Sequence, residues 1–330
     1  MRVADPETGL RSLIAVHDTT LGPALGGARF HPYADDEAAL YDVLRLARGM
    51  TYKSAVAGID VGGGKAVIIG DPRRDKTPEL LRAYGRFVDR LGGRYVTAPD
   101  VGTSEADMVV VREATGHVTG LPLAHGGFGD PSPATARGLW HALRGVQRWL
   151  TGGTDLSAWH VVVLGTGKVG SALVRLLQAE GSRITVADVD RGRAEALGVA
   201  VVDPETAHTV ECDVFSPCAL GGILDPRHIA GLRCRAVVGA ANNQLSTPES
   251  AGLLAARGIV YAPDYVVNAG GIISVAEELR HGSLERVAQG VVRIEATTVE
   301  VLERAAADGI TTAVAADAMA EARLARARAA

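Results

Sequence analysis

One stretch in the middle of the chain restricts the fold more than any other. The apolar run 160–164 leads directly into Gly165-Thr166-Gly167-Lys168-Val169-Gly170, then an amphipathic segment, then a second apolar run that ends at Asp188. A strand, a glycine-rich turn, a helix and a strand ending in an acid form the unit that binds dinucleotides. The glycines let a pyrophosphate approach the helix N-terminus, where N–H groups and the helix dipole favour it. The sequence therefore predicts a parallel α/β domain that binds a dinucleotide, with a tight turn that binds nothing as the alternative.

The acid at the end of this unit indicates which dinucleotide is bound. Asp188 would accept hydrogen bonds from the adenosine ribose, and its charge would repel a 2′-phosphate. Arg191 and Arg193 weaken this preference without reversing it. NAD is therefore favoured over NADP.

The chain beyond Asp188 repeats one plan, an apolar strand that ends in small or polar residues at the ligand edge of the sheet. We predict these segments at 213–219, 236–243, 259–264 and 266–271. Asn243 and Asn268 are amides that could bind nicotinamide, ribose or substrate, or could be turn and cap residues. Cys218 is interpreted as a small lining residue because no histidine base accompanies it.

Two lysines stand in an otherwise small and apolar segment of the N-terminal part of the chain. Lys53 ends a predicted helix, and Lys65 follows three glycines, 62–64. Ammonium groups held close together in a dry cleft repel one another, and burial disfavours the charged form, so such a lysine exchanges protons near neutral pH. The glycines remove every Cβ beside Lys65 and let a small molecule approach. A surface lysine after a flexible turn is the alternative.

An acid and a glycine-rich loop add to this group. Asp100 follows a predicted strand at 95–97, at the end where open α/β sheets place their ligands, so it is a candidate acid/base group or else a turn residue. The loop at 21–27 exposes backbone N–H groups that could hold a carboxylate.

Periodicity and cap residues predict the other elements. Strands are expected at 13–16 and 66–69, helices at 35–50, 77–91, 134–150 and 300–330, and a hinge between domains at 125–133. The last helix is expected to pack on the first domain or on another subunit.

Composition excludes several classes of protein. A length of 330 residues suggests about two domains, and 47% hydrophobic with 22% charged residues supports real cores. The net charge of −4 provides no basic field for nucleic acid or an anionic membrane. Three cysteines without a CxxC motif argue against a disulfide framework and a structural zinc site, and they fit a reducing cytoplasm. We expect a soluble, cytoplasmic protein without a bound metal.

Six long sequence motifs in a fixed order indicate a family resemblance. They lie at 21–27, 47–53, 62–72, 93–103, 239–245 and 261–271. With these motifs the chain resembles the leucine/valine/phenylalanine dehydrogenases, a branch of the amino-acid dehydrogenase superfamily that includes glutamate dehydrogenase, and most closely the branched-chain members. The resemblance implies an NAD-dependent, reversible oxidative deamination of an L-amino acid to its 2-oxo acid and ammonia.

The resemblance also implies an architecture. An N-terminal α/β substrate domain and a C-terminal Rossmann-type NAD-binding domain would enclose the active site in the cleft between them. Residues 1–130 and 305–330 would form the substrate-binding and oligomerisation domain, and 131–304 the dinucleotide-binding domain. A homo-oligomer, a dimer or an octamer, is expected.

Residue roles follow from the resemblance by position. Lys65 would be the base toward the water that adds to the iminium, and Asp100 would move the proton between the amino group and the intermediates. Lys53 would bind the substrate carboxylate, helped by the backbone at Gly27 and the amide of Asn268. The expected cofactor contacts are Thr135 at the nicotinamide carboxamide and then Gly165, Thr166, Gly167, Lys168, Val169, Gly170, Asp188, Cys218, Ala219, Ala241, Asn243 and Asn268.

The side-chain pocket of the substrate maps to Leu25, Ala98, Ile272 and Val275. Leu25 and Ala98 resemble the aliphatic class, so valine, isoleucine or leucine is predicted over phenylalanine. Hydrophobic pockets separate substrates that differ by one methylene by only about 1–3 kcal/mol, so no choice is made among the three.

Other functions stay open at this point. Pro99 resembles the aromatic branch, which leaves an aromatic or secondary-pathway amino-acid dehydrogenase as an alternative. A catalytically silent NAD-binding protein would have no chemical need for Lys53, Lys65 and Asp100 together. A 2-hydroxy-acid dehydrogenase usually has a histidine–carboxylate pair at the hydride site, and no histidine here lies in a matching motif.

Overall fold

The computed structural model describes residues 1–329, which form two compact units. Unit 1 contains residues 1–131 and 274–286 and the chain from residue 320 onward. Unit 2 contains residues 132–273 and 287–319. The predicted hinge at 125–133 includes the first boundary between the units. We predicted that the chain rejoins the first domain once, at 305–330. In the structure it rejoins unit 1 in two shorter segments, 274–286 and from residue 320 onward.

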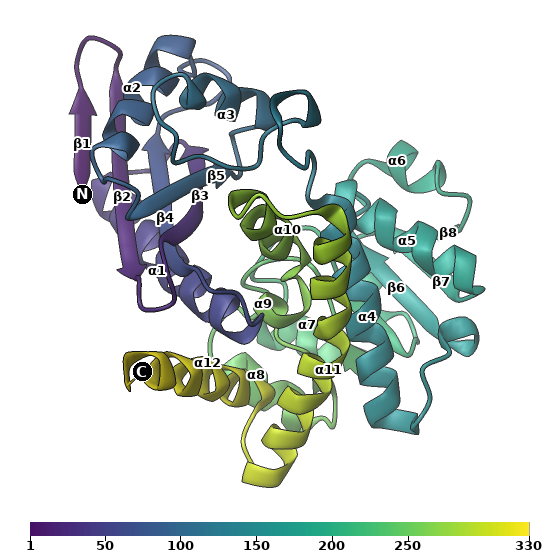
Figure 1. Cartoon of the computed structure of the whole chain (residues 1–330). Helices are drawn as coiled ribbons and strands as arrows, with labels where there is room; N and C mark the ends of the chain where they lie inside the picture. Colours follow the sequence, from purple (N-terminus) through teal and green to yellow (C-terminus); the bar gives the residue numbers. More distant parts are fainter. Residues whose placement is uncertain (330) are drawn as a thin grey trace. The chain divides into compact units, whose positions relative to one another are not determined.

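Unit 1 is built on a five-stranded mixed sheet (Figure 1). Its strands are β1 (Arg2–Asp5), β2 (Leu10–Asp18), β3 (Ala24–His31), β4 (Gly62–Ile69) and β5 (Tyr95–Pro99), and its helices are α1 (Asp36–Val56), α2 (Pro78–Asp89), α3 (Glu105–Arg112) and the 3₁₀ turn η1 (Leu123–His125). The order is β1-β2-β4-β3-β5, with β2 antiparallel to β1 and β4, and β3 parallel to β4 and β5. The predicted strands and helices of this region are therefore confirmed, including the start of α2 at its cap, Thr77. The loop predicted at 21–27 is wrong from residue 24 onward, because β3 begins there and pairs with β4 and β5.

Alternation along the strands determines which helix covers each face of this sheet. On β4, Ala66 and Ile68 belong to the core that includes residues of α2 and α3. Val67 lies on the opposite face and packs against Ala39 and Val43 of α1. Because successive side chains of a strand point to opposite faces, Lys65 shares the α1 face with Val67.

Unit 2 is built on a six-stranded parallel sheet. Its strands are β6 (His160–Leu164), β7 (Arg183–Ala187), β8 (Ala200–Val201), β9 (Val214–Pro217), β10 (Ala236–Val237) and β11 (Val260–Tyr261). Its helices are α4 (Ser132–Thr151), η2 (Leu156–Ala158), α5 (Lys168–Glu180), α6 (Arg191–Glu195), η3 (Ala207–Thr209), α7 (Pro226–Gly231), α8 (Glu249–Ala256) and α9 (Asp264–Val267). The order β11-β10-β9-β6-β7-β8 reverses direction between β6 and β9, and dinucleotides bind at such a reversal.

Three helices complete the chain, and each contains residues of both units (Figure 1). They are α10 (Gly270–Leu279), α11 (Leu284–Asp308) and α12 (Thr312–Ala329). The prediction of a strand at 266–271 is wrong, because these residues form the end of α9 and the start of α10. The predicted helix at 300–330 is interrupted at Gly309, whose φ of 64° ends α11.

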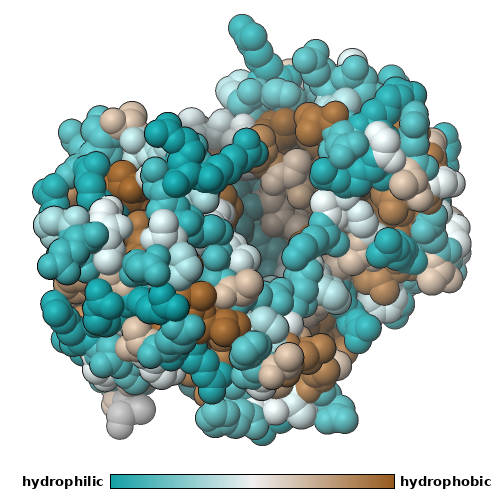
Figure 2. All heavy atoms as spheres, turned by 90° about the horizontal axis from the view of Figure 1, so that it is seen from above, coloured by the Kyte–Doolittle hydropathy of each residue, from teal (hydrophilic) through white to brown (hydrophobic). Residues whose placement is uncertain are grey.

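None of the described helices has the features of a membrane span. Among residues 1–329, no helix is both long enough and apolar enough to cross a bilayer. On the face drawn in Figure 2, hydrophilic residues cover most of the surface and apolar residues gather in smaller patches. In the same residues, no group of three His, Cys, Asp or Glu side chains is placed to hold a metal ion.

Candidate functional site

Lys65 and Asp100 form a buried ion pair in unit 1. Lys65 lies on β4, and Asp100 follows the last residue of β5. The distance from Lys65 Nζ to Asp100 Oδ2 is 2.7 Å, and the two side chains are 8% and 18% exposed. The structure thus brings together the two residues predicted to carry the proton chemistry.

The position of Asp100 is determined by two neighbouring residues. The Asp100 N–H donates to the Thr103 hydroxyl at 2.9 Å, and that hydroxyl donates to Ala28 O at 2.8 Å. A Cβ on Gly27 would lie 2.7 Å from the Asp100 Cβ. Gly27 is therefore needed so that the chain carrying Asp100 can lie against β3.

Lys53 lies in the last turn of α1 and is partly exposed. Two residues before it, the Thr51 backbone lies so close to β4 that a Cβ on Gly63 would be 2.1 Å from Thr51 N. The side chain of Arg323 donates to Ser54 O at 3.1 Å and to Ala55 O at 2.9 Å, and so holds the same end of α1. This contact confirms that the C-terminal helix packs on the first unit.

The glycines before Lys65 have a packing role in the structure. A Cβ on Gly64 would lie 2.7 Å from the Tyr95 ring, and one on Gly62 would lie 2.0 Å from Asp18 O. Together with Gly63 they allow α1, Tyr95 and β2 to approach the start of β4. We predicted instead that these glycines open space for a ligand, and the structure explains all three by contacts within unit 1.

Leu25 and Ala98, predicted to line the substrate pocket, lie on neighbouring strands. Leu25 is 1% and Ala98 6% exposed, and Gly27 pairs with Ala98 across the sheet. Alternation along β3 places Leu25 and Gly27 on the same face. Ile272 and Val275 lie three residues apart on α10, and therefore on one side of that helix.

Sequence reasoning missed a second cation beside Asp100. Arg29 on β3 contacts Asp100 Oδ2 through Nε at 3.3 Å and Asp42 Oδ2 through Nη1 at 2.9 Å. Burial opposes ionisation of Asp100, but Lys65 and Arg29 hold the pKa of Asp100 below its ordinary value. The signal in the sequence was weak: Arg29 stands two residues after Gly27 and shares its face of the strand.

Sequence reasoning also missed Glu278 on α10. Its carboxylate is buried and accepts N–H groups from Gly120 at 2.8 Å, Leu121 at 3.1 Å and Phe128 at 2.9 Å. It therefore ties the end of α10 to the loop that precedes the boundary of unit 1. Nothing local in the sequence marks this contact.

The glycine-rich turn of unit 2 fits a dinucleotide. Gly165 has a φ of 100°, and a Cβ there would lie 2.7 Å from the Ala219 Cβ. A Cβ on Gly170 would lie 1.9 Å from Gly165 O, so α5 packs closely on the turn. Gly167 caps α5 without a side-chain hydrogen bond, which leaves the first N–H groups of the helix for an anion. Thr166 is buried, whereas Lys168 is exposed and Val169 partly so.

Asp188 lies at the end of β7 beside this turn. Its Oδ2 accepts from Thr166 N at 2.6 Å and from the Thr166 hydroxyl at 2.8 Å, and its side chain is 6% exposed. Burial opposes ionisation, but the N–H groups of Asp190 and Thr166 hold the pKa of Asp188 below its ordinary value. Arg193 Nη1 lies 3.8 Å from Asp188 Oδ2.

The other predicted cofactor residues follow the neighbouring strands. Cys218 donates its N–H to Leu164 O at 2.7 Å, and burial raises the pKa of its thiol, as suits a lining residue. Ala241 N–H donates to Pro217 O at 2.9 Å, which places the turn after β10 beside the turn after β9. Asn243 is exposed in this second turn with a φ of 54°.

Asn268 follows α9 and is buried. Its Nδ2 donates to Ala240 O at 3.0 Å and to Asn242 Oδ1 at 2.9 Å. Its Oδ1 is buried without a hydrogen-bond partner in the described chain, which leaves one end of the amide for a ligand. Thr135 lies nearby in the first turn of α4, where a Cβ on Gly270 would lie 2.9 Å from its Cα.

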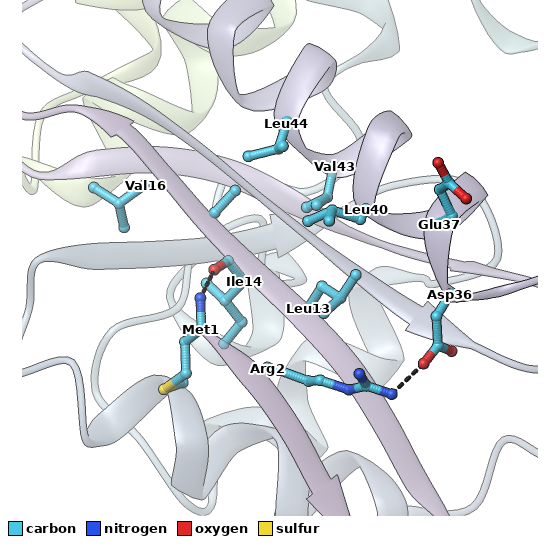
Figure 3. A pocket seen from close by; sticks show the side chains of 11 residues that line it. Met1, Arg2, Leu13, Ile14, Val16, Asp36, Glu37, Leu40, Val43 and Leu44 are labelled. Atoms are coloured by element: carbon cyan, nitrogen blue, oxygen red, sulfur yellow. Dashed lines mark hydrogen bonds and ion pairs between the residues drawn. The ribbon is translucent and has the colours of Figure 1, made fainter.

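A pocket of about 650 Å³ lies elsewhere in unit 1, between β2 and α1 (Figure 3). Leu13, Val16, Leu40 and Leu44 line it, and Arg2 is paired with Asp36 at its edge. None of the predicted site residues lines this pocket. It is therefore separate from the Lys65–Asp100 pair.

Comparisons with known proteins agree over nearly the whole chain. Residues 2–117 match a family described as "Glu/Leu/Phe/Val dehydrogenase, dimerisation domain", and 190–330 match "Glutamate/Leucine/Phenylalanine/Valine dehydrogenase". A leucine dehydrogenase of Geobacillus stearothermophilus is 48% identical over 97% of this chain and 88% of that protein. A phenylalanine dehydrogenase of Bacillus thermotolerans is 46% identical over 97% of this chain and 86% of that protein. The crystal structure of L-tryptophan dehydrogenase from Nostoc punctiforme superposes with a TM-score of 0.87 at 40% identity, covering 100% of this chain and 96% of that one.

Proposed function

The chain belongs to the glutamate/leucine/phenylalanine/valine dehydrogenase family, and we propose that it catalyses the reversible, NAD-dependent oxidative deamination of a branched-chain L-amino acid. It is an amino-acid dehydrogenase of the leucine/phenylalanine branch, an oxidoreductase that acts on the CH–NH₂ group. The products of the proposed reaction are the 2-oxo acid and ammonia.

The observation that carries the proposal is the buried Lys65–Asp100 pair at 2.7 Å. When bound, the nicotinamide cofactor accepts the hydride from the substrate Cα. Lys65, after giving up its own proton, takes one from the water that attacks the imino carbon. Asp100 takes a proton from the substrate ammonium group before the hydride leaves, and later returns it to the nitrogen that leaves as ammonia. A lysine and a carboxylate in contact can pass protons in this way without bulk water.

We propose further residues for substrate binding. We propose that Lys53 and the backbone at Gly27 bind the carboxylate. The amide of Asn268 is proposed to help through its oxygen, which has no partner in the described chain and can accept a hydrogen bond from the substrate amino group. Unit 1 is then the substrate-binding and oligomerisation unit, and unit 2 binds the dinucleotide. The family description of residues 2–117 as a dimerisation domain supports a homo-oligomer.

NAD rather than NADP is the proposed cofactor. The ionised carboxylate of Asp188 at the end of β7 supports this choice, because it accepts hydrogen bonds from a ribose and repels a 2′-phosphate. Arg193 lies 3.8 Å away and is half exposed, so it reduces this repulsion only in part.

The aliphatic substrate class is inferred from the pocket residues. Leu25, Ala98 and Ile272 are buried. In the proposed pocket the side chain of Leu25 would occupy room that an aromatic ring needs. The leucine and phenylalanine dehydrogenases are nearly equally similar to the chain, so identity does not separate the two classes. Leu25→Ala is expected to raise kcat/KM for phenylalanine relative to leucine, because it opens space beside Ala98.

Reduction of the cofactor tests the proposal directly. The purified protein is assayed with L-valine, L-isoleucine, L-leucine, L-phenylalanine and L-tryptophan, each with NAD and with NADP. We expect the highest kcat/KM for an aliphatic amino acid with NAD. A higher value for phenylalanine or tryptophan would establish the aromatic alternative.

The role of Lys65 is tested separately. Lys65→Met is expected to lower kcat by about 10²–10⁴-fold, the usual contribution of a positioned acid or base. NAD binding, measured by fluorescence titration, should be unchanged because Lys65 belongs to unit 1. Parental kcat in this variant would contradict the proposed chemistry.

A further inference from the structure

Arg29 contacts the same oxygen of Asp100 that Lys65 contacts. Lys65 Nζ and Arg29 Nε lie 2.7 Å and 3.3 Å from Asp100 Oδ2. The Arg29 side chain is 20% exposed, so little water competes with this contact. Asp100 is thus held between two cations that come from two neighbouring strands, β4 and β3.

The other end of Arg29 is anchored to α1. Its Nη1 donates to Asp42 Oδ2 at 2.9 Å, and that carboxylate also accepts the Tyr33 hydroxyl at 2.7 Å. Arg45 donates to Asp42 Oδ1 at 3.2 Å without a contact to Asp100. The planar guanidinium therefore bridges Asp42 and Asp100, which a shorter or rotating cation could not do.

The proposed reaction requires this second cation. While Lys65 is the base it is neutral, and Asp100 then has no charge from Lys65 to balance its own. A buried carboxylate without a cation would take up a proton. A guanidinium does not lose its proton in proteins, so Arg29 supplies a positive charge at every stage of the cycle.

On this basis we propose that Arg29 is a positioning residue for the reaction: it holds the Asp100 carboxylate in place and favours its ionised form between its own proton transfers, while Lys65 releases and regains its proton. The inference rests on the proposed function of Lys65 and Asp100. It adds a permanent charge to a pair in which the lysine must change charge.

The groups that face Asp100 agree with this role. Lys65 from β4 and Arg29 from β3 lower the pKa of Asp100 against the effect of burial. Tyr95 from β5 faces it as well, and burial raises the pKa of that phenol, which stays neutral. Arg29 itself is half-buried, which alone would lower its pKa, but Asp100 and Asp42 raise it.

The acid limb of the kcat/KM profile against pH is the test. Arg29→Met is expected to move this limb to higher pH by about one unit, because the pKa of Asp100 rises when a neighbouring cation is lost. On that limb the value of kcat/KM at a fixed pH then falls about ten-fold. Arg29→Lys keeps a positive charge but cannot bridge both carboxylates, so it should move the limb in the same direction by less than Arg29→Met does.

Two further variants separate this effect from structural damage. Arg45→Met also removes an arginine from Asp42 but has no contact to Asp100, so its profile should match the parent. Asp42→Asn removes the negative charge that Arg29 also balances, so the Arg29 charge acts on Asp100 alone. The pKa of Asp100 should then fall, and the acid limb should move to lower pH. Shifts of opposite sign in Arg29→Met and Asp42→Asn cannot come from general destabilisation. A parental profile in a folded Arg29→Met variant would overturn the inference.

An NMR titration makes the test independent of activity. In protein labelled at the aspartate carboxyl carbons, the Asp100 signal is the one missing from Asp100→Asn. Its midpoint should rise by about one pH unit in Arg29→Met and stay in place in Arg45→Met. If no amino acid reduces NAD, the proposed function fails while this midpoint still tests the contact. If the parent is active and neither midpoint nor profile moves, the Arg29 inference alone fails.

Discussion

Glu278 is expected to stabilise the loop at 120–128 through three hydrogen bonds to its backbone. Its Oε1 accepts the N–H groups of Gly120 and Leu121, and its Oε2 accepts that of Phe128. Gly120 and Leu121 are buried, and Phe128 is half-buried. Glu278→Ala would leave all three donors without an acceptor in a place that water enters poorly.

The size of the effect follows from these three bonds. An orphaned buried donor costs about 1–3 kcal/mol, and the half-buried Phe128 N–H regains part of its loss from water, so the local stability should fall by about 3–5 kcal/mol. Glu278→Gln keeps an oxygen for Gly120 and Leu121 but turns an NH₂ group toward Phe128, so about 1–3 kcal/mol is expected.

Hydrogen exchange followed by mass spectrometry on the full chain measures this locally. A loss of about 3–5 kcal/mol corresponds to exchange about 150- to 4,000-fold faster in peptides that cover 120–128. Glu277→Ala is the matched control, because that carboxylate pairs with Arg286 at 3.0 Å and Arg280 at 4.0 Å instead of the loop. Unchanged exchange in Glu278→Ala, or equal acceleration in Glu277→Ala, would refute the reasoning.

Three further predictions concern other parts of the chain. Gly63→Ala places a Cβ 2.1 Å from Thr51 N, where it clashes with the backbone of α1, so soluble yield and melting temperature should drop sharply. Gly49→Ala is the control: it has open space around it and should lower neither. The pKa of Asp42 is held low by Tyr33 and Arg29 against burial, so its contribution to stability is present above about pH 4 and is lost as pH falls through the folded-state pKa. Asp42→Asn should therefore flatten acid unfolding monitored by circular dichroism, and an unchanged curve would contradict this. Asp188→Ala should raise the KM for NAD and increase the NADP/NAD ratio of kcat/KM; a parental ratio would remove the basis for the NAD preference.

Local signals in the sequence determined much of unit 2 and the frame of unit 1. The apolar run of β6, the glycine turn and Asp188 lie within one short segment, so their strand–turn–helix–strand order follows from neighbouring residues. The cap residue Thr77 marks the start of α2 for the same reason. The segment at 266–271 was misjudged because a short apolar run has no period that distinguishes a buried strand from a buried helix.

Tertiary structure alone decided which distant side chains meet. Arg29 and Asp100 are 71 residues apart, and their contact depends on the parallel register of β3 and β5. Glu278 reaches Gly120 across 158 residues, through the return of the chain to unit 1. A residue's type and its near neighbours determine its own conformation, whereas its partner is chosen by how whole strands and helices pack. Lys65 and Asp100 could therefore be selected from the sequence as candidates, and the second cation that contacts Asp100 could not.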